Sequence, residues 1–173
     1  MDRKTGGIFG TVASIIAALL ILYVLINIYN IGLDNIFSTP TIYVMAGLIV
    51  SGVFALIGYW HYTLEARWRM RNLSPIALTI GALGVVLGYL YGPMLGGSLI
   101  VLAYVIELFV GIRLYEDFKS TSPTGARLFL IGVVVFMVFL PVILVAQEAA
   151  LVSAIGDIVK IAGLLVVLRA LME

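Results

Sequence analysis

The chain has 173 residues, of which 63% are apolar and only 11% are charged, and its formal net charge is +1. A soluble domain carries about 25% charged residues, so this chain has too few polar side chains to cover a water-facing surface. With no Cys and a single His, it excludes disulfides, thiolate metal sites and bis-histidine haem ligation within the chain. We therefore expect a membrane protein without a cofactor.

Six apolar stretches follow one another, each long enough to cross a bilayer as a helix of about 20 residues. The first follows Arg3 and Lys4, but its apolar run is too long for a signal peptide, so we predict a retained helix. The predicted fold is all-α: a polytopic bundle of six transmembrane helices in three hairpins, forming one domain over residues 1–173. The predicted spans are 8–29, 42–62, 75–92, 94–112, 126–146 and 149–171.

Proline and glycine mark several ends of these spans. Ser74 and Pro75 form a capped helix start, with Pro at the first helical position. Gly92 and Pro93 predict a tight turn between the third and fourth spans. Pro141 falls inside the fifth span, where the loss of one backbone hydrogen bond predicts a kink.

Positive charge is unevenly distributed among the gaps between the apolar stretches. Nine of the ten Lys and Arg residues lie at alternate ends of the apolar stretches, and the other three gaps contain none. Short cytoplasmic loops of membrane proteins retain positive charge, so we predict a cell-membrane protein with both termini and the 113–127 loop cytoplasmic. The nine residues are Arg3, Lys4, Arg67, Arg69, Arg71, Arg113, Lys119, Arg127 and Arg169.

The segment from His61 to Asn72 is the most basic part of the chain. We predict that the second helix leaves the membrane here and continues along the interface. Two interpretations remain open: a docking site for anionic lipid or a partner, and a simple anchor that sets the topology. The residues of this predicted cytoplasmic interface are His61, Arg67, Trp68, Arg69 and Arg71.

Gly84, Gly88 and Gly92 recur every four residues along the third span. Glycines at this spacing form a groove on one helix face, into which a second backbone can pack. The groove predicts an oligomer contact, a substrate-lining surface, or packing against a neighbouring helix of the same chain.

Three ionisable residues fall inside predicted spans: Glu107 in the fourth, and Asp157 and Lys160 in the sixth. Each charge near a helix centre costs about 2.5–3.5 kcal/mol, so the sixth span must face the bundle or a partner. We expect Lys160 to be neutralised by Asp157, Glu107 or both, beside the small residues Ser153, Gly156 and Gly163. An ion or proton pathway, a structural ion pair and a contact with another subunit all remain open.

The layout of six helices in fewer than 180 residues, with Ala13 and Ala17 four apart in the first, resembles the substrate-binding components of energy-coupling vitamin transporters. Those proteins carry Ala-x-x-x-Ala signatures in helix one. The chain departs from them in the outer halves of spans four to six, which lack the polar residues of a vitamin pocket. We therefore assign no family on this resemblance.

Motifs for phosphate binding, serine hydrolysis and zinc hydrolysis are missing from the sequence, and its basic residues are too dispersed for a nucleic-acid surface. We therefore expect a protein that is not an enzyme and binds no nucleic acid. The first hypothesis is a small transport or ion/proton-translocation component. The alternative is a non-catalytic accessory subunit of a larger respiratory or secretion complex. Its expected partners are the lipid bilayer and either further copies of itself or other membrane subunits.

Overall fold

All regular structure in the described residues is helical. The computed structural model describes residues 1–33, 36–37, 41–63 and 68–173, without the side chains of residues 68–72. Six of its helices are long and apolar enough to cross a membrane, as predicted. They are α1 (Arg3–Ile31), α2 (Thr41–Tyr62), α3 (Trp68–Tyr91), α4 (Pro93–Thr121), α5 (Pro123–Phe139) and α6 (Ala149–Met172), and α5 is followed by the 3-10 helix η2 (Pro141–Leu144).

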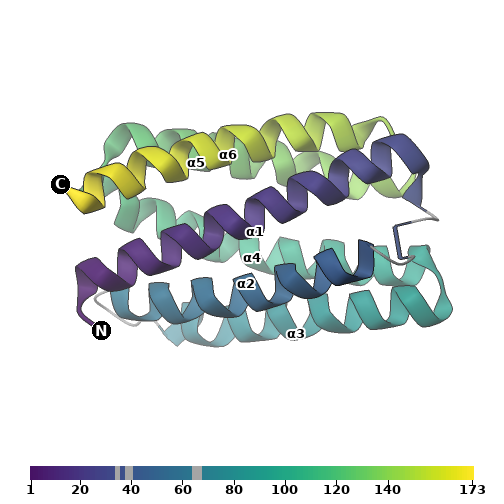
Figure 1. Ribbon diagram of the computed structural model, residues 1–173, viewed down its shortest axis with the longest axis horizontal. Coiled ribbons are helices and arrows are strands. Elements are labelled where there is room, and N and C mark those ends of the chain that lie inside the picture. Colours follow the sequence, from purple (N-terminus) through teal and green to yellow (C-terminus); the bar gives the residue numbers. More distant parts are fainter. Residues whose placement is uncertain (34–35, 38–40, 64–67) are drawn as a thin grey trace.

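The helices lie side by side along the long axis, and both chain ends lie at the same end of the bundle (Figure 1). We call this the terminal end, and the opposite end, which holds Gly32, Gly92 and Gln147, the far end. Each helix packs on the next in chain order, and α6 packs back on α1. The six helices therefore form a closed ring around a common interior.

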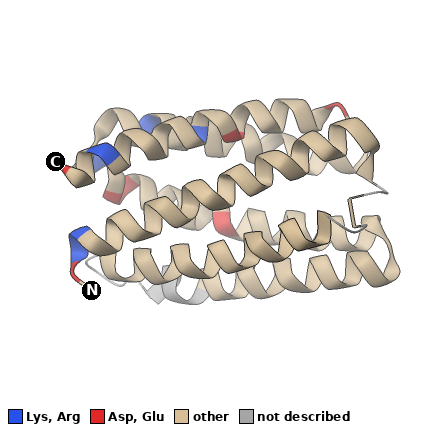
Figure 2. Ribbon diagram, in the orientation of Figure 1, with Lys and Arg blue, Asp and Glu red and all other residues tan. Residues whose placement is uncertain are grey.

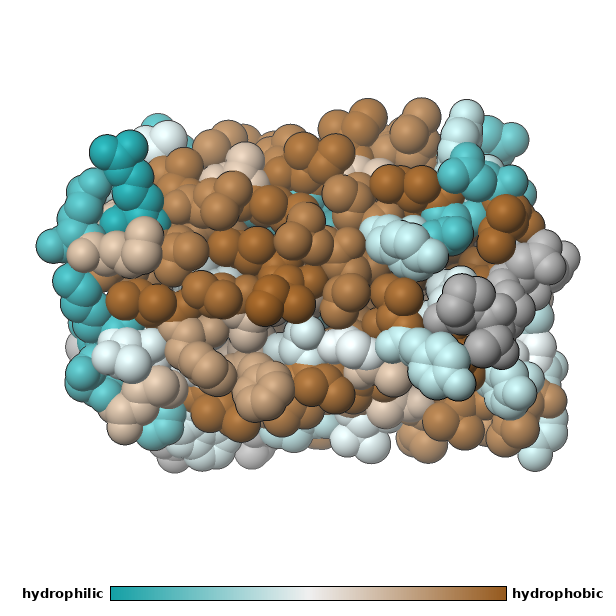
Figure 3. Space-filling model, viewed as in Figure 1, coloured by the Kyte–Doolittle hydropathy of each residue, from teal (hydrophilic) through white to brown (hydrophobic). Residues whose placement is uncertain are grey.

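The outer surface is apolar along the sides of the bundle. Figure 3 shows a broad hydrophobic band over the helices, with hydrophilic residues at both ends of the bundle. Large apolar side chains such as Ile16, Val50 and Phe109 point outward along this band. Such a band is what lipid requires of a protein surface, and it supports the assignment as a membrane protein.

Glycines bring three pairs of helices into backbone contact. A Cβ added at these positions would overlap backbone atoms of the facing helix, so only glycine permits the observed spacing. No such contact joins α2 to α3 or α4 to α5 among the described glycines. The contacting residues are Gly10 and Gly58 in α1–α2, Gly88 and Gly96 in α3–α4, and Gly132 and Gly156 in α5–α6.

The third helix begins earlier than predicted. It starts at Trp68 rather than at Pro75, which lies inside the helix. Proline lacks an N–H and its ring crowds the carbonyl of the preceding turn, so the helix loses one hydrogen bond at Pro75. The helix continues through that loss, and the Ser-Pro pair is therefore not its start.

The fourth helix also extends past its predicted end, to Thr121, and α5 begins at Pro123. The predicted 113–127 loop is therefore wrong, because only Ser122 separates the two helices. Beyond residue 112 the sequence loses hydropathy but keeps a helical pattern, since Leu114 and Phe118 remain buried. Hydropathy indicates where a span leaves the membrane, not where its helix ends.

Two local features fix other helix ends. Pro141 does not kink a continuous helix as predicted: α5 stops at Phe139 and a 3-10 turn begins at the proline. At the start of the chain, the Asp2 carboxylate accepts a hydrogen bond from the Thr5 N–H at 2.7 Å and caps α1. This hydrogen bond lowers the pKa of Asp2.

Candidate functional site

Figure 2 shows acidic and basic residues part-way along the bundle as well as at its ends. Glu107 belongs to α4, and Asp157 and Lys160 belong to α6. Helices α4 and α6 are not neighbours in the ring, so the charges approach one another only across its interior.

Lys160 forms an ion pair with Asp157, three residues earlier on the same helix. The Asp157 side chain is 0% exposed and that of Lys160 is 13% exposed. The ammonium also lies 4.9 Å from the centre of the Phe136 ring, a cation-π contact. The expected neutralisation of Lys160 by Asp157 is therefore confirmed.

Helix α5 covers this ion pair. A Cβ at Gly132 would overlap the backbone of Lys160, and one at Gly156 would lie 2.6 Å from the Phe136 nitrogen. Ser153, one turn before Asp157, is fully buried. The expectation that small residues of α6 admit a second helix beside Lys160 is confirmed, and that helix is α5.

Glu107 lines two adjoining cavities inside the ring, of about 170 Å³ and about 160 Å³. Tyr104 and Phe136 line both cavities, as do Ala17 and Leu78. Because the two cavities share these walls, they adjoin each other, and Glu107 is one of the residues between them. Glu107 itself makes no ion pair within 4 Å in the part of the chain that the structure describes.

The two cavities differ in chemistry. The larger has apolar walls from Leu25, Met45, Val85 and Ile100, and Glu107 is the one charged residue among its described lining residues. The smaller also contains Lys160 and, with Ser14, Tyr59 and Ser74, several hydroxyl groups. The smaller cavity is therefore the more polar of the two, although apolar side chains also line it.

An aromatic cluster closes the terminal end of the interior. Phe118 contacts the rings of Tyr59, Tyr62 and Phe129 at centroid distances of 5.8, 5.9 and 5.3 Å. The Tyr62 hydroxyl lies 2.8 Å from the Thr121 hydroxyl. Arg3 donates a hydrogen bond to the Tyr62 carbonyl at 3.0 Å. These contacts join α1, α2, α4 and α5 on the terminal side of the cavities.

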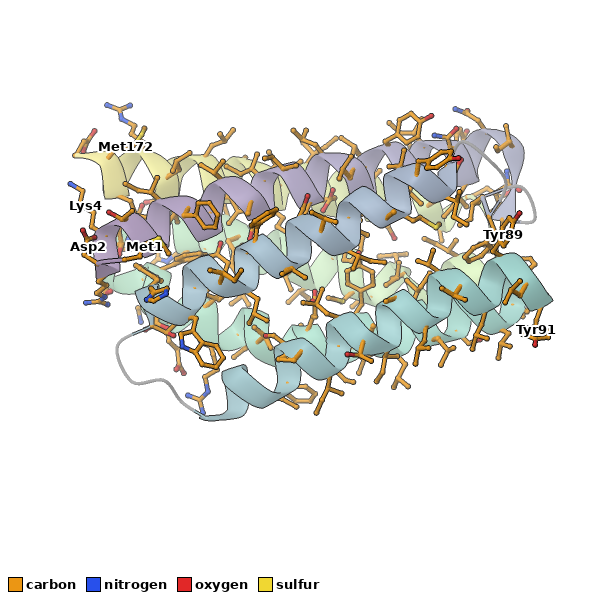
Figure 4. All side chains as sticks on the ribbon, turned by 60° about the horizontal axis from the view of Figure 1, so that its bottom comes forward. Met1, Asp2, Lys4, Tyr89, Tyr91 and Met172 are labelled. Atoms are coloured by element: carbon orange, nitrogen blue, oxygen red, sulfur yellow. The ribbon has the colours of Figure 1, made fainter. Side chains whose placement is uncertain are left out.

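Figure 4 shows Met1, Asp2, Lys4 and Met172 at the terminal end of the bundle, with Tyr89 and Tyr91 at the far end.

The predicted glycine groove of α3 packs within the chain. A Cβ at Gly84 would meet Ile100 and Gly96 of α4, and one at Gly88 would overlap the Phe37 ring. Gly92 takes no part in this packing, because a Cβ there would meet nothing within 4 Å. It lies in the turn before α4 with φ 110°, a conformation that favours glycine.

The predicted cytoplasmic interface is only partly described. Helix α2 ends at Tyr62, so it does not continue to Asn72 as predicted, and His61 is exposed in its last turn. Arg67 lies outside the described residues, and Trp68, Arg69 and Arg71 lie in the first turn of α3 without described side chains. The docking of anionic lipid or a partner at this segment stays a prediction.

Sequence reasoning identified the three charges but missed the two cavities and the aromatic cluster. The close contact of α5 with α6 could have been predicted from the spacing of its glycines. Gly125 and Gly132 are seven residues apart, and so are Gly156 and Gly163. The described residues contain no group of three potential metal ligands. No protein-family model, curated protein or solved structure matches this chain.

Proposed function

We propose that this protein is a small membrane transport component that moves protons or a cation, with Glu107 on the path. One observation carries the proposal: Glu107 and Lys160 line the same interior space at mid-helix. Ionisable residues at such a depth are costly, and they commonly mark substrate or ion pathways.

The division of the three charges supports this reading. A structural ion pair needs two partners, and Asp157 and Lys160 already supply them. Glu107 is then an additional carboxyl group that faces a cavity. Without an interior function it would cost about 2.5–3.5 kcal/mol of insertion free energy for no structural gain.

We propose that the protein lies in the cell membrane, with the terminal end of the bundle in the cytoplasm. Arg3, Lys4, Arg113 and Arg169 belong to the helix ends at this side of the bundle, and positive charge is retained on the cytoplasmic side. Both termini are then cytoplasmic, and the far end faces outward. We propose that the protein works in the bilayer as a homo-oligomer or with other membrane subunits.

Proton flux into reconstituted vesicles tests the proposal. Purified protein is placed in vesicles loaded with a pH-sensitive dye, and a pH gradient is imposed with the membrane potential clamped. We expect the parent protein to dissipate the gradient and Glu107→Gln to reduce its rate at least tenfold. The amide keeps the shape of the side chain but cannot release a proton.

Glu148→Gln is the matched control, because Glu148 is exposed at the far end and lines neither cavity. It should conduct at the parental rate. Equal rates for Glu107→Gln and the parent protein would overturn the proposal. Recovery of the protein with stoichiometric partners and no flux would instead favour an accessory subunit.

A further inference from the structure

We propose that the interior space binds an organic monocation whose apolar body is about the size of one aromatic ring. Its ammonium group would lie at Glu107 and its body in the larger cavity. This inference rests on the proposed transport function and names the class of cargo. Four features of the described site support it: net charge, cavity shape, aromatic lining and the scarcity of oxygen ligands.

The charge of the site selects a cation. Asp157 and Lys160 neutralise each other within α6. Without a ligand, Glu107 can hold a proton; when it is ionised, the interior carries one negative charge beyond the Asp157–Lys160 pair. A buried charge without a partner is very costly, so one positive charge placed beside it is strongly favoured over an anion or a neutral molecule.

The shape of the site selects an apolar body. The larger cavity has a volume of about 170 Å³ and walls such as Leu25, Met45 and Ile100. An apolar cavity of about 150 Å³ accommodates benzene. A ring therefore fills the larger cavity, while a group attached to it reaches the shared walls at Glu107.

Aromatic rings stand where the cationic group would lie. Tyr104 and Phe136 line both cavities beside Glu107, and their rings are edge to face with centroids 5.2 Å apart. The Lys160 ammonium already lies over the Phe136 ring. Aromatic faces attract ammonium groups, and quaternary ammonium ligands are often held this way.

A metal ion fits this site poorly. Calcium takes about 6–8 oxygen ligands, and magnesium requires a near-octahedral shell. In the larger cavity the described lining side chains that carry oxygen are Glu107 and Tyr104. A quaternary ammonium group holds its waters weakly, so one carboxylate and an aromatic face can take their place.

Calorimetric titration of the purified protein in detergent tests this inference with benzyltrimethylammonium as the probe. The anion 4-methylbenzenesulfonate, of similar size but opposite charge, is titrated in parallel, and empty micelles give the background. We expect saturable binding of the cation at least tenfold tighter than that of the anion. Glu107→Gln should weaken cation binding at least tenfold, and Glu148→Gln should leave it unchanged.

A second variant keeps the test decisive if Glu107→Gln does not fold. Ala17 lines both cavities, so Ala17→Phe fills the space and should weaken cation binding while Glu107 remains. Equal affinity for cation and anion, or parental binding by both variants, would overturn the inference. Cation binding without flux of either protons or the bound cation would contradict only the transport proposal, and flux without cation selectivity would contradict only this one.

Discussion

The ion pair between Asp157 and Lys160 is the costliest feature of α6 and the one most dependent on both partners. Its carboxylate is fully buried and its ammonium nearly so. Removing one member of a buried pair leaves the other charge unsatisfied, whereas replacing both is often close to neutral. We therefore expect a single substitution at Asp157 to lower stability and the double substitution to leave it nearly unchanged.

Asp157→Asn should lower the free energy of unfolding by about 3–5 kcal/mol, because it leaves the Lys160 charge without its partner. Lys160→Met should remain folded, since the lone buried carboxyl group can hold a proton. Its stability should fall as the pH rises and that proton is lost. Unfolding in mixed detergent micelles, followed by circular dichroism between acidic and alkaline pH, measures both effects.

The double variant Asp157→Asn/Lys160→Met serves as the control for this cycle. It carries no charge in α6 at these positions, so it should recover most of the stability that Asp157→Asn loses. If the effects of the single variants simply add in the double variant, the ion pair contributes no coupling and our account of it is wrong.

At the scale of single residues, the sequence indicated which charges are buried but not which of them pair with one another. The cost of burying a charge is large enough to single out Glu107, Asp157 and Lys160 from composition and position alone. Which acid pairs with Lys160 depends on the rotation of α4 and α6 in the ring. Helical rise gives the heights of these residues but not that rotation.

The three close helix pairs depend on glycine at a few positions. At Gly58 an added Cβ would overlap the backbone of Gly10, and backbone atoms cannot move aside as a flexible side chain can. At Gly81 the same addition would lie 3.6 Å from the Ala103 Cβ, an ordinary contact. These two helix-interior glycines therefore form a matched comparison.

Gly58→Ala should lower the free energy of unfolding by about 1–3 kcal/mol through overpacking. Gly81→Ala should keep or slightly raise stability, because alanine has the better helix propensity and the space is present. Thermal unfolding in one detergent compares them directly. A Gly58→Ala variant as stable as Gly81→Ala would show that α1 and α2 do not pack as closely as described.

Helix ends were the least predictable elements. The helix from Pro93 to Thr121 runs nine residues past its predicted end at 112 because buried Leu114 and Phe118 sustain it beyond the apolar core. Ser122 then accepts a hydrogen bond from the Gly125 N–H at 3.3 Å and starts α5 at once. A hydropathy pattern cannot register a capping hydrogen bond of this kind.

At the scale of the whole molecule, the sorted charges make a prediction about orientation. Ser120 lies next to Thr121, which contacts Tyr62 at the terminal end. Glu148 follows Gln147, whose side chain donates a hydrogen bond to the Tyr29 carbonyl at 2.7 Å at the far end. The two positions therefore mark opposite ends of the bundle.

Single-cysteine variants at these positions report the orientation, since the chain has no native Cys. In intact cells, a membrane-impermeant thiol reagent should label Glu148→Cys and should not label Ser120→Cys. Permeabilised cells provide the control in which both are labelled. Labelling of Ser120→Cys from outside would reverse the proposed orientation.

The number of spans was predictable because each needs about 20 apolar residues and the gaps carry polar and turn-forming residues. The closed order of the ring and its interior space were not. They depend on which face each helix presents to its neighbours, and helices that are apolar all round carry little such signal. The position of Glu107 between two cavities follows from that packing, so no reading of α4 alone could predict it.

The glycine pairs also determine how stiffness is distributed in the bundle. Where backbones touch, as at Gly132 and Gly156, no rotamer is available to absorb a displacement. Across the seam between α2 and α3 the contact is the Leu78 side chain against Gly52, and a side chain can turn. The bundle is thus three stiff bodies joined by softer seams. Because Gly52 and Leu78 line both cavities, we expect a change in interior volume to tilt these helix pairs against one another and not to bend their helices.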